Sequence, residues 1–239
     1  MMSESGNMAQ PHHDDVFVRE LFDKMGPTYG ITNVVTSFGF SEWWRYACVN
    51  QVSIEAGETV CDMMAGSGEC WRYLPKQSVV LSIDFSSFMV EKQHERNEKR
   101  GQPVDVRCES ALATSIESQS VDVVVSAFGL KTLSRDATRD FAQEISRILK
   151  PGGKFSLIEI SVPQSSFLKV PYEWYLRKVI PLFGKFCLSD IECYRMLGIY
   201  TREFESCARV LPYFCEAGLD VTFSNHFFGC ATSLSGTKK

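Results

Sequence analysis

The chain has 239 residues, a length that suits one large domain or a core with a modest cap. Acidic and basic residues are interspersed and the formal net charge is -4, so no basic surface argues for nucleic acid. No apolar run approaches the roughly 18–20 residues of a membrane span, and the first residues lack the apolar stretch of a secretory signal. We therefore expect no nucleic-acid partner and no integral membrane segment.

The nine cysteines are scattered along the chain without CxxC pairs. A disulfide framework would be unusual in a chain of this size, so we expect buried free thiols in a reducing, cytoplasmic setting. No group of His, Cys and Asp residues has metal-ligand spacing, so we expect no metal. The oligomeric state stays open, with a homodimer as one expectation.

Three stretches follow a leader that we expect to be flexible over residues 1–13. Residues 14–53 are rich in aromatic residues at helical spacing and predict a helical lid. Short β-type runs and helical segments alternate over residues 59–161. Residues 163–203 predict an aromatic, helical cap insertion. We expect residues 14–239 to form one domain.

The alternating stretch predicts the fold. Its β-type runs are Thr59–Met63, Val79–Asp84, Val104–Cys108, Val121–Ala127 and Lys154–Ser161. The helical segments between them are Glu69–Leu74, Phe88–Arg100 and Arg135–Leu149. Strands that alternate with helices form a parallel sheet with helices on both faces.

The last part of the chain adds an antiparallel pair. After a helix expected over Phe204–Cys215, the runs Leu219–Phe223 and Phe228–Leu234 are placed to pair as a hairpin at the sheet edge. The sequence thus predicts an α/β, Rossmann-like, seven-stranded and mostly parallel sheet with a terminal antiparallel strand.

A glycine turn after the first run is the sharpest functional signal. Asp62 is followed by Met63-Met64-Ala65-Gly66-Ser67-Gly68. Parallel sheets bind ligands at the carboxyl ends of their strands, and glycines let the backbone approach a ligand closely. A plain tight turn is the alternative.

Polar residues end the next two strands. Asp84 closes the second, where a carboxylate can accept hydrogen bonds from ribose hydroxyls. The segment Cys108-Glu109-Ser110-Ala111 follows the third, where a polar side chain can meet an adenine amine. For Asp84 the alternative is a helix cap before Ser86.

These features resemble the class I methyltransferases, and most closely the ubiquinone/menaquinone biosynthesis C-methyltransferases. The resemblance covers residues 16 to 237. The matching positions are Phe22, Tyr29, Asn33, Ser37-Phe38-Gly39, Trp44, Asp62, Gly66, Gly68, Ala127-Phe128-Gly129-Leu130, Leu149-Lys150-Pro151-Gly152-Gly153, Glu159, Asp190, Tyr194-Arg195, Leu197 and Gly229-Cys230-Ala231-Thr232 through Gly236.

The resemblance implies a methyltransferase that uses S-adenosyl-L-methionine on a lipophilic, quinone-like or polyketide-like small molecule, with carbon methylation favoured. The residues expected to bind the cofactor are Asp62, Met64, Ala65, Gly66, Gly68, Asp84, Phe85, Ser110, Ala111, Ala127 and Phe128. The residues expected at the reacting centre are Tyr29, Lys131, Glu159, Tyr194 and Arg195.

Three positions depart from the family pattern. Met64 replaces the first glycine of the turn and crowds the methionine end of the cofactor pocket. Lys131-Thr132 replaces Arg-Asn at the mouth of the substrate site, and lysine cannot reproduce the planar fork of arginine. Gly30 replaces an aspartate.

The acid–base roles have alternatives. Carbon methylation requires removal of a proton, for which Glu159 is a candidate base. It can instead be a structural partner for a helix terminus or for Arg195. Tyr29, Tyr194 and Arg195 can orient a substrate oxygen, or serve packing and ion pairing. His226 is expected to be structural.

Two rival functions remain. Met64 motivates a protein that keeps the cofactor pocket but does not transfer methyl groups, such as a scaffold or a cofactor-assisted cyclase or isomerase. An NAD-dependent dehydrogenase is permitted by Asp84, but Ala127-Phe128-Gly129-Leu130 and Lys150-Pro151-Gly152-Gly153 disfavour it.

Overall fold

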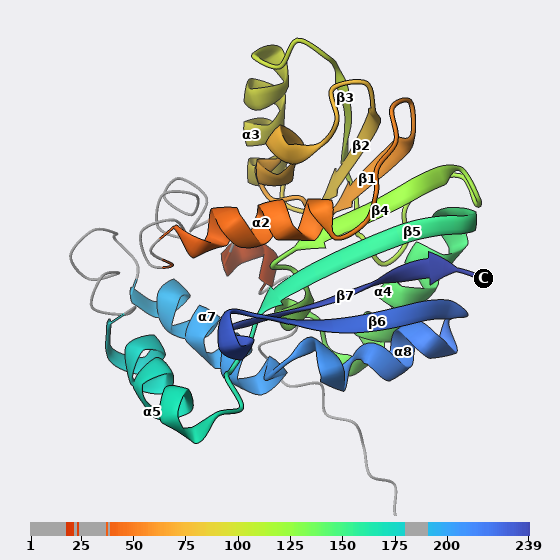
Figure 1. Cartoon of the computed structure of the whole chain (residues 1–239). Coiled ribbons are helices and arrows are strands. Elements are labelled where there is room, and N and C mark those ends of the chain that lie inside the picture. Colours follow the sequence, from red (N-terminus) through yellow and green to blue (C-terminus); the bar gives the residue numbers. More distant parts are fainter. Residues whose placement is uncertain (1–17, 22, 24–36, 38, 180–190) are drawn as a thin grey trace, which may run out of the picture.

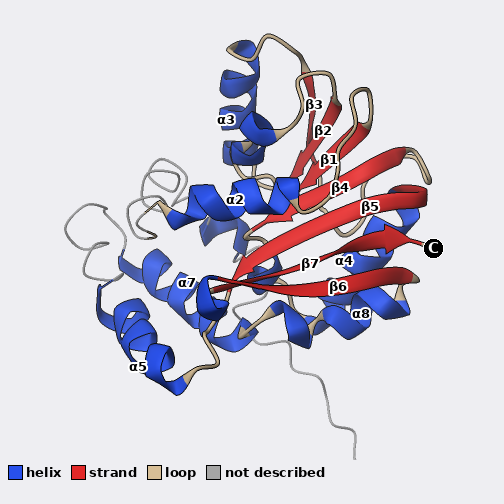
Figure 2. Cartoon of the chain, in the orientation of Figure 1, coloured by secondary structure: helices blue, strands red, loops and turns tan. Residues whose placement is uncertain are grey.

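A seven-stranded sheet forms the centre of the computed structural model, which describes residues 18–21, 23, 37, 39–179 and 191–239. The strand order is β3-β2-β1-β4-β5-β7-β6 (Figures 1 and 2). The strands are β1 Thr59–Met63, β2 Val79–Asp84, β3 Val104–Cys108, β4 Val121–Ala127, β5 Leu149–Ile160, β6 Leu219–His226 and β7 Ala231–Lys238. Strands β1 to β5 pair in parallel, whereas β7 pairs antiparallel with β5 and β6. The fold class predicted from the sequence is confirmed.

Helices cover both faces of this sheet because the strands alternate their apolar side chains between the two faces. On one face, Val60 of β1 joins the cluster formed with Trp71 of the short helix η2 (Glu69–Tyr73) and with helix α2 (Phe40–Asn50). On the other face, Met63 joins the cluster formed with Phe141 of α4 (Arg135–Ile148) and with α8 (Leu211–Glu216). Figure 2 shows α2 in front of the sheet and α4 and α8 behind it.

The remaining described helices surround the carboxyl edge of the sheet or connect strands. They are α3 Ser87–Glu98, η3 Leu130–Thr132, α5 Ser166–Trp174, η4 Tyr175–Val179, α7 Ile191–Phe204, η5 Cys207–Arg209 and η6 Phe227–Gly229. Helix α2 belongs to the expected lid (14–53), and α5, η4 and α7 belong to the expected cap (163–203). The leader over 1–13 lies outside the described residues.

Several boundaries differ from the sequence prediction. The single helix expected over residues 204–215 is wrong, because α7 ends at Phe204, Glu205 has a φ of 60°, and a new helix with Pro212 in its first turn begins at Leu211. Strand β5 begins at Leu149 rather than Lys154, with a shift in its pairing to β4 across the glycine turn. The helix expected at residues 69–74 is a 3-10 helix.

The glycine turn after β1 brings its backbone to the carboxyl edge. Gly68 has a φ of 77°, and a Cβ at this position would lie 2.6 Å from the ring of Trp71. No other residue fits there, because both the backbone conformation and the packing of Trp71 exclude a side chain. The turn is therefore held against the sheet by an indole that is 2% exposed.

Met64 and Gly129 form a size-matched pair across this edge. Met64 has a φ of 53°, in the region that favours glycine. Its side chain lies where a side chain at position 129 would be: a Cβ on Gly129 would lie 2.7 Å from Sδ and 2.8 Å from Cβ and Cε of Met64. The methionine is accommodated because the residue after Phe128 has no side chain.

This pairing predicts the effect of a single methyl group. Gly129→Ala should lower the free energy of unfolding by about 1–3 kcal/mol, since the methyl group overlaps the Met64 side chain. Gly129 has the ordinary φ of -98°, so its backbone permits alanine. In a Met64→Gly background the same change should be neutral or should stabilise by about 0.4–1 kcal/mol.

Urea unfolding of the wild type, the two single variants and the double variant measures this coupling. An equal cost of Gly129→Ala in both backgrounds would show that the two residues do not compete for the same space.

Candidate cofactor and active site

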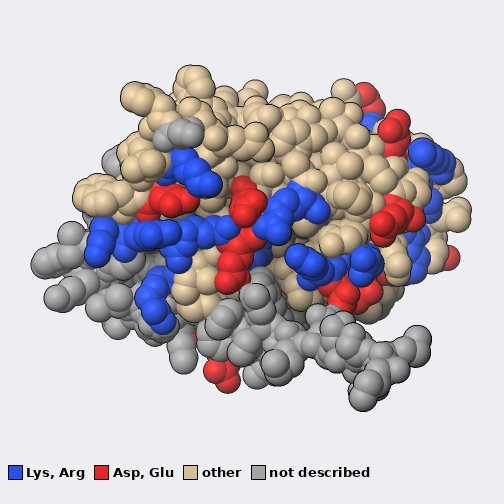
Figure 3. Space-filling model, turned by 90° about the horizontal axis from the view of Figure 1, so that it is seen from below, with Lys and Arg blue, Asp and Glu red and all other residues tan. Residues whose placement is uncertain are grey.

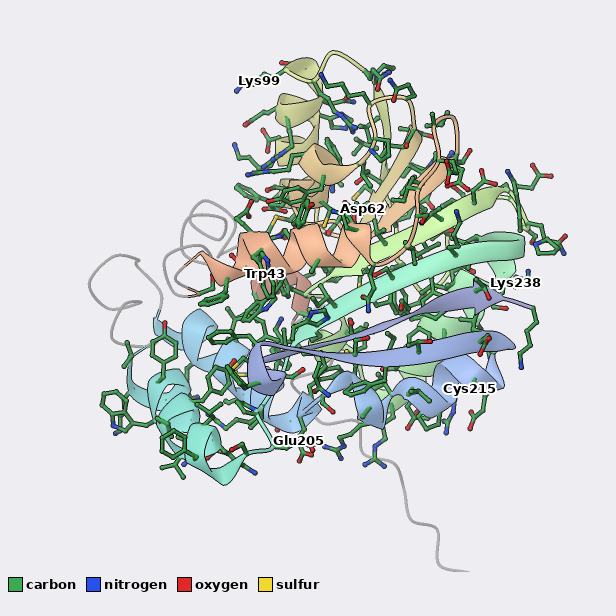
Figure 4. The ribbon with its side chains drawn as sticks, in the orientation of Figure 1. Trp43, Asp62, Lys99, Glu205, Cys215 and Lys238 are labelled. Atoms are coloured by element: carbon green, nitrogen blue, oxygen red, sulfur yellow. The ribbon has the colours of Figure 1, made fainter. Side chains whose placement is uncertain are left out.

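A pocket lies at the carboxyl edge of β1, β2 and β4. Its lining residues are Arg45, Asp62, Met64, Ala65, Gly66, Glu69, Cys70, Asp84, Phe85, Met89, Ala127, Phe128, Gly129 and Thr132. Figure 4 labels Asp62 beside helix α2, which supplies Arg45. The residues proposed from the sequence that meet here are Asp62, Met64, Ala65, Gly66, Asp84, Phe85, Ala127 and Phe128. Strand ends far apart in the sequence thus contribute to one pocket.

Three residues proposed for the cofactor do not line this pocket. Gly68 packs under Trp71 instead. Ser110 is exposed, and its hydroxyl accepts a hydrogen bond from the amide of Leu112 at 3.3 Å. Ala111 is buried in the core cluster that contains Phe141. Their part in cofactor binding therefore stays a prediction.

Sequence reasoning missed Arg45, Glu69, Cys70, Met89 and Gly129 as lining residues, and it placed Thr132 only at the mouth of the substrate site. Arg45 is the most informative of these, because a guanidinium only 3% exposed is rare without partners. It pairs with Glu42 at 2.8 Å and lies over the Phe128 ring at 5.0 Å. The only available signal was an arginine within the aromatic run of α2, three residues after a glutamate.

Asp84 joins the ends of β1 and β2. One carboxylate oxygen accepts the amide of Gly66 at 2.8 Å, and the other accepts the amide of Ser86 at 3.0 Å. Ser86, and not Asp84, caps helix α3, since its hydroxyl accepts the amide of Met89. Burial raises the pKa of Asp84 to about 7, although the two backbone hydrogen bonds oppose the shift.

Asp62 is a buried carboxylate in the pocket wall. Its side chain is 1% exposed and neither oxygen has a partner of good geometry. Burial, together with the negative charges of Glu69 and Asp84, raises the pKa of Asp62 well above its usual value; Arg45 and the nearby indole of Trp71 act in the opposite direction. A buried carboxylate without a partner costs free energy, unless a ligand supplies the missing partner.

The donor set fits S-adenosylmethionine. The pocket holds three carboxylates, on Asp62, Glu69 and Asp84, and one guanidinium, on Arg45. The cofactor carries a sulfonium and an ammonium, which suit the carboxylates, and a carboxylate, which suits the guanidinium. Its ribose hydroxyls are donors of the kind that Asp62 and Asp84 can accept. The unpartnered oxygens of Asp62 are the observation that most directly indicates such a ligand.

Lys131 and Glu159 form a buried ion pair behind the pocket wall. The Lys131 ammonium lies 2.7 Å from Glu159 Oε1, with the two side chains 3% and 0% exposed. The ammonium also donates to the carbonyl of Phe128 at 3.0 Å, and Glu159 accepts the amides of Lys131 and Ile160. Neither residue lines the pocket. This arrangement favours the structural alternative for Glu159, with Lys131 and not Arg195 as its partner.

The ion pair supports an unusual backbone position. Phe128 lines the pocket with a φ of 70°, which a bulky residue rarely adopts. Its carbonyl is held by Lys131, its amide donates to the carbonyl of Ile158 at 2.9 Å, and the guanidinium of Arg45 lies over its ring. The pair therefore fixes the place of an aromatic ring in the pocket wall.

The other residues proposed at the reacting centre are less defined. Arg195 is an exposed residue of α7. Tyr194 belongs to the same helix, but its side chain, like all of Tyr29, lies outside the described residues. His226 contacts the Ser233 hydroxyl across the β6–β7 hairpin at 2.8 Å, which agrees with a structural role.

The described cysteines are free thiols, and burial raises the pKa of Cys48 to about 12. Cys108, expected to be buried, is exposed. Within the described ranges, no cluster of His, Cys, Asp and Glu is arranged to hold a metal ion. In the same part of the chain, no helix has both the length and the apolar character needed to cross a membrane.

Curated relatives resemble the chain over nearly its whole length. A demethylmenaquinone methyltransferase of Lactiplantibacillus plantarum is 31% identical over 93% of this chain and 96% of its own. A protein of the same name from Listeria monocytogenes is 30% identical over 93% of this chain and 95% of its own.

Solved structures share the fold. A SAM-dependent methyltransferase of Thermotoga maritima, described as a possible histamine N-methyltransferase, matches with a TM-score of 0.64 at 18% identity, covering 92% of this chain and 99% of its own. The (4+2) cyclase SpnF matches with a TM-score of 0.63 at 13% identity, covering 92% and 94%.

The ubiE/COQ5 methyltransferase family is matched by residues 9–238. Together with the curated relatives, this match shows that the chain belongs to the ubiE/COQ5 methyltransferase family and is an S-adenosylmethionine-dependent methyltransferase.

Proposed function

We propose that the chain transfers a methyl group from S-adenosylmethionine to a ring carbon of a lipophilic, quinone-like small molecule in its reduced, quinol form. The observation that carries the proposal is the pocket in which Asp62, Asp84 and Arg45 meet next to an aromatic wall. The names of the relatives, demethylmenaquinone methyltransferases, support this class of substrate.

The carboxylates and Arg45 are the residues that we propose hold the cofactor, which supplies a methyl group already activated on a sulfonium. Asp84 orients the Gly66 amide and keeps acceptor capacity for hydroxyl groups. Arg45, held by Glu42 and the Phe128 ring, offers a positive charge to a carboxylate. Because the methyl donor is reactive, the protein mainly positions the partners and excludes water.

An aromatic cluster beside the pocket supports an apolar, planar substrate. Trp44 and Phe128 are buried in it, and Phe40 and Tyr172 pack against it. Phe128 and Ala127 belong to both the pocket wall and this cluster, so the two regions meet. Apolar walls with a few polar groups are the usual composition of small-molecule sites.

We propose that Tyr29, Tyr194 and Arg195 orient the substrate oxygen, and that the proton it loses passes to solvent water. Lys131 and Glu159 act through Phe128 as positioning residues, because their charges are satisfied by each other and by backbone groups. A cytoplasmic location is a further part of the proposal, supported by the buried free thiols.

Met64 motivates a test of the alternative, a cofactor-binding protein of this family that does not transfer methyl groups, which the family match and the curated relatives disfavour. The family pattern has glycine at position 64. In this chain the Met64 side chain occupies the space next to Gly129 in the pocket wall. Turnover separates the two candidates, since only the first consumes the cofactor.

The proposed function is tested by isotope transfer. Purified protein is incubated with S-adenosylmethionine carrying a deuterated methyl group and with a short-chain demethylnaphthoquinol. Mass spectrometry should find the label on a ring carbon of the product. Retained, unconsumed cofactor in the presence of quinols and polyketide-type phenols would favour the second candidate.

The pH dependence of cofactor binding follows from Asp84. Its raised pKa means that the folded, ligand-free protein favours the protonated carboxyl, so this group's contribution to stability is lost as pH rises from about 4 towards 7. Hydroxyl donors of a bound cofactor favour the ionised form. The rise in melting temperature caused by S-adenosylmethionine should therefore be larger at about pH 8 than at about pH 6.

Asp84→Asn is the matched control, because asparagine keeps one acceptor oxygen but does not titrate. Thermal denaturation with and without cofactor should show the pH effect in the wild type and not in this variant. An identical pH effect in both proteins would assign it to another group.

The buried ion pair predicts a large cost for losing one partner. Lys131→Met should lower the free energy of unfolding by about 3–5 kcal/mol, since it leaves the Glu159 charge buried and uncompensated. Lys131→Met/Glu159→Gln should recover most of this loss. As a control, Lys150→Met breaks the more exposed pair with Asp122, at 2.7 Å, and should cost less than about 1 kcal/mol.

Turnover of the same variants distinguishes positioning from base catalysis. The well-folded double variant should keep methyl transfer within about tenfold of the wild type. A loss of about a hundredfold or more, the usual contribution of a general base, would show that Glu159 takes the proton.

A further inference from the structure

Helix α5 has apolar side chains on two faces. On the inner face, Leu168 and Tyr172 are partly buried, and Tyr172 packs against the aromatic cluster beside the pocket. On the outer face, Phe167, Val170 and Trp174 follow helical spacing and are 86%, 71% and 61% exposed. Figure 4 shows side chains of α5 that extend away from the rest of the molecule at the lower left. We call Phe167, Val170 and Trp174 the outer face of α5.

A strained aromatic turn lies next to the start of this segment. Phe227 and Phe228, in the turn between β6 and β7, have φ values of 43° and 56° and are 46% and 75% exposed. A Cβ on the neighbouring Gly229 would lie 3.5 Å from Cα of Pro163, in the chain that leads into α5. Two consecutive bulky residues in the left-handed region cost free energy, and such strain persists mainly at functional places.

Basic residues flank the outer face of α5. Lys169, Arg177 and Lys178 are exposed, whereas Glu173 is the only acidic residue of residues 166–179. This segment is therefore positive on a chain whose formal net charge is -4. Figure 3, seen from below, shows Lys and Arg side chains, with Asp and Glu side chains among them, beside an uncharged area at its left, the end that α5 occupies in Figure 1.

We propose that the outer face of α5 docks the protein on the surface of an anionic lipid bilayer. Exposed Phe and Trp with Lys and Arg beside them suit the interfacial region, where rings enter the acyl boundary and cations meet acidic headgroups. The basic flank argues against a second copy of the chain, because a two-fold contact through this face would bring like charges together.

The docking would bring the aromatic cluster close to the membrane, because Tyr172 on the inner face of the same helix packs against that cluster. A substrate dissolved in the bilayer would then have a short path to the pocket. Binding to lipid requires neither that substrate nor catalysis. A negative result for membrane binding would therefore leave the proposed function untouched, and a negative result for methyl transfer would leave this proposal untouched.

Vesicle flotation tests the proposal. The whole protein is mixed with phosphatidylcholine vesicles that contain about a quarter phosphatidylglycerol, or none. The wild type should float with the anionic vesicles and be released at about 0.5 M salt. Phe167→Ser/Val170→Ser should bind at least about tenfold more weakly, because its apolar area is lost. Val79→Ser, which removes an apolar side chain 56% exposed at the start of β2, should bind like the wild type.

Melting temperature and affinity for S-adenosylhomocysteine of each variant confirm that it is folded. Wild-type protein that does not float, or a double variant that floats as well as the wild type, would overturn the proposal. A wild-type dimer in sedimentation that Phe167→Ser/Val170→Ser converts to a monomer would also overturn it, by assigning the face to a second copy.

Discussion

The carboxylate of Asp84 joins the two turns on which the pocket is built. Its oxygens accept amides from Gly66, after β1, and from Ser86, after β2, so the ends of neighbouring parallel strands are held in one arrangement. The same carboxylate lies near Glu69 and Asp23, whose negative charges disfavour its ionisation. The geometry of the turn thus depends on a buried carboxyl group whose ionisation costs the ligand-free protein free energy.

Two further interactions hold the pocket wall that follows β4. The pair of Lys131 and Glu159 fixes the backbone at Phe128, and the absence of a side chain at Gly129 leaves room for Met64. Both Phe128 and Met64 occupy the left-handed region, where a non-glycine residue is strained. The wall of the pocket is therefore a strained region that the surrounding ion pair and packing maintain.

Much of this could be predicted from the sequence, because it depends on local patterns. The parallel strands were predicted closely, since apolar runs that end in glycine or aspartate are local signals. The prediction of one helix over 204–215 was wrong because the positive φ of Glu205, which interrupts the helix, does not change the spacing of apolar residues in the sequence.

The site was harder to predict where it depends on packing between distant segments. Arg45 reaches the pocket from α2, and Lys131 turns away from it towards Glu159, 28 residues later. No sequence spacing encodes either contact. Lys131 follows β4, a position that in the sequence suggests the mouth of the substrate site. Only the three-dimensional structure shows that its ammonium forms an ion pair with the buried carboxylate of Glu159.

We propose that the unpartnered carboxylate of Asp62 is kept for a cationic, hydroxyl-bearing cofactor. The most direct measurement combines the melting temperature of ligand-free Asp62→Asn at about pH 8 with calorimetric titration of S-adenosylmethionine. We predict a variant that melts at a higher temperature, because a buried charge is gone, and that binds the cofactor at least about tenfold more weakly, or about 1.4 kcal/mol. A variant that melts lower and binds with unchanged affinity would show that Asp62 serves the fold and not the cofactor.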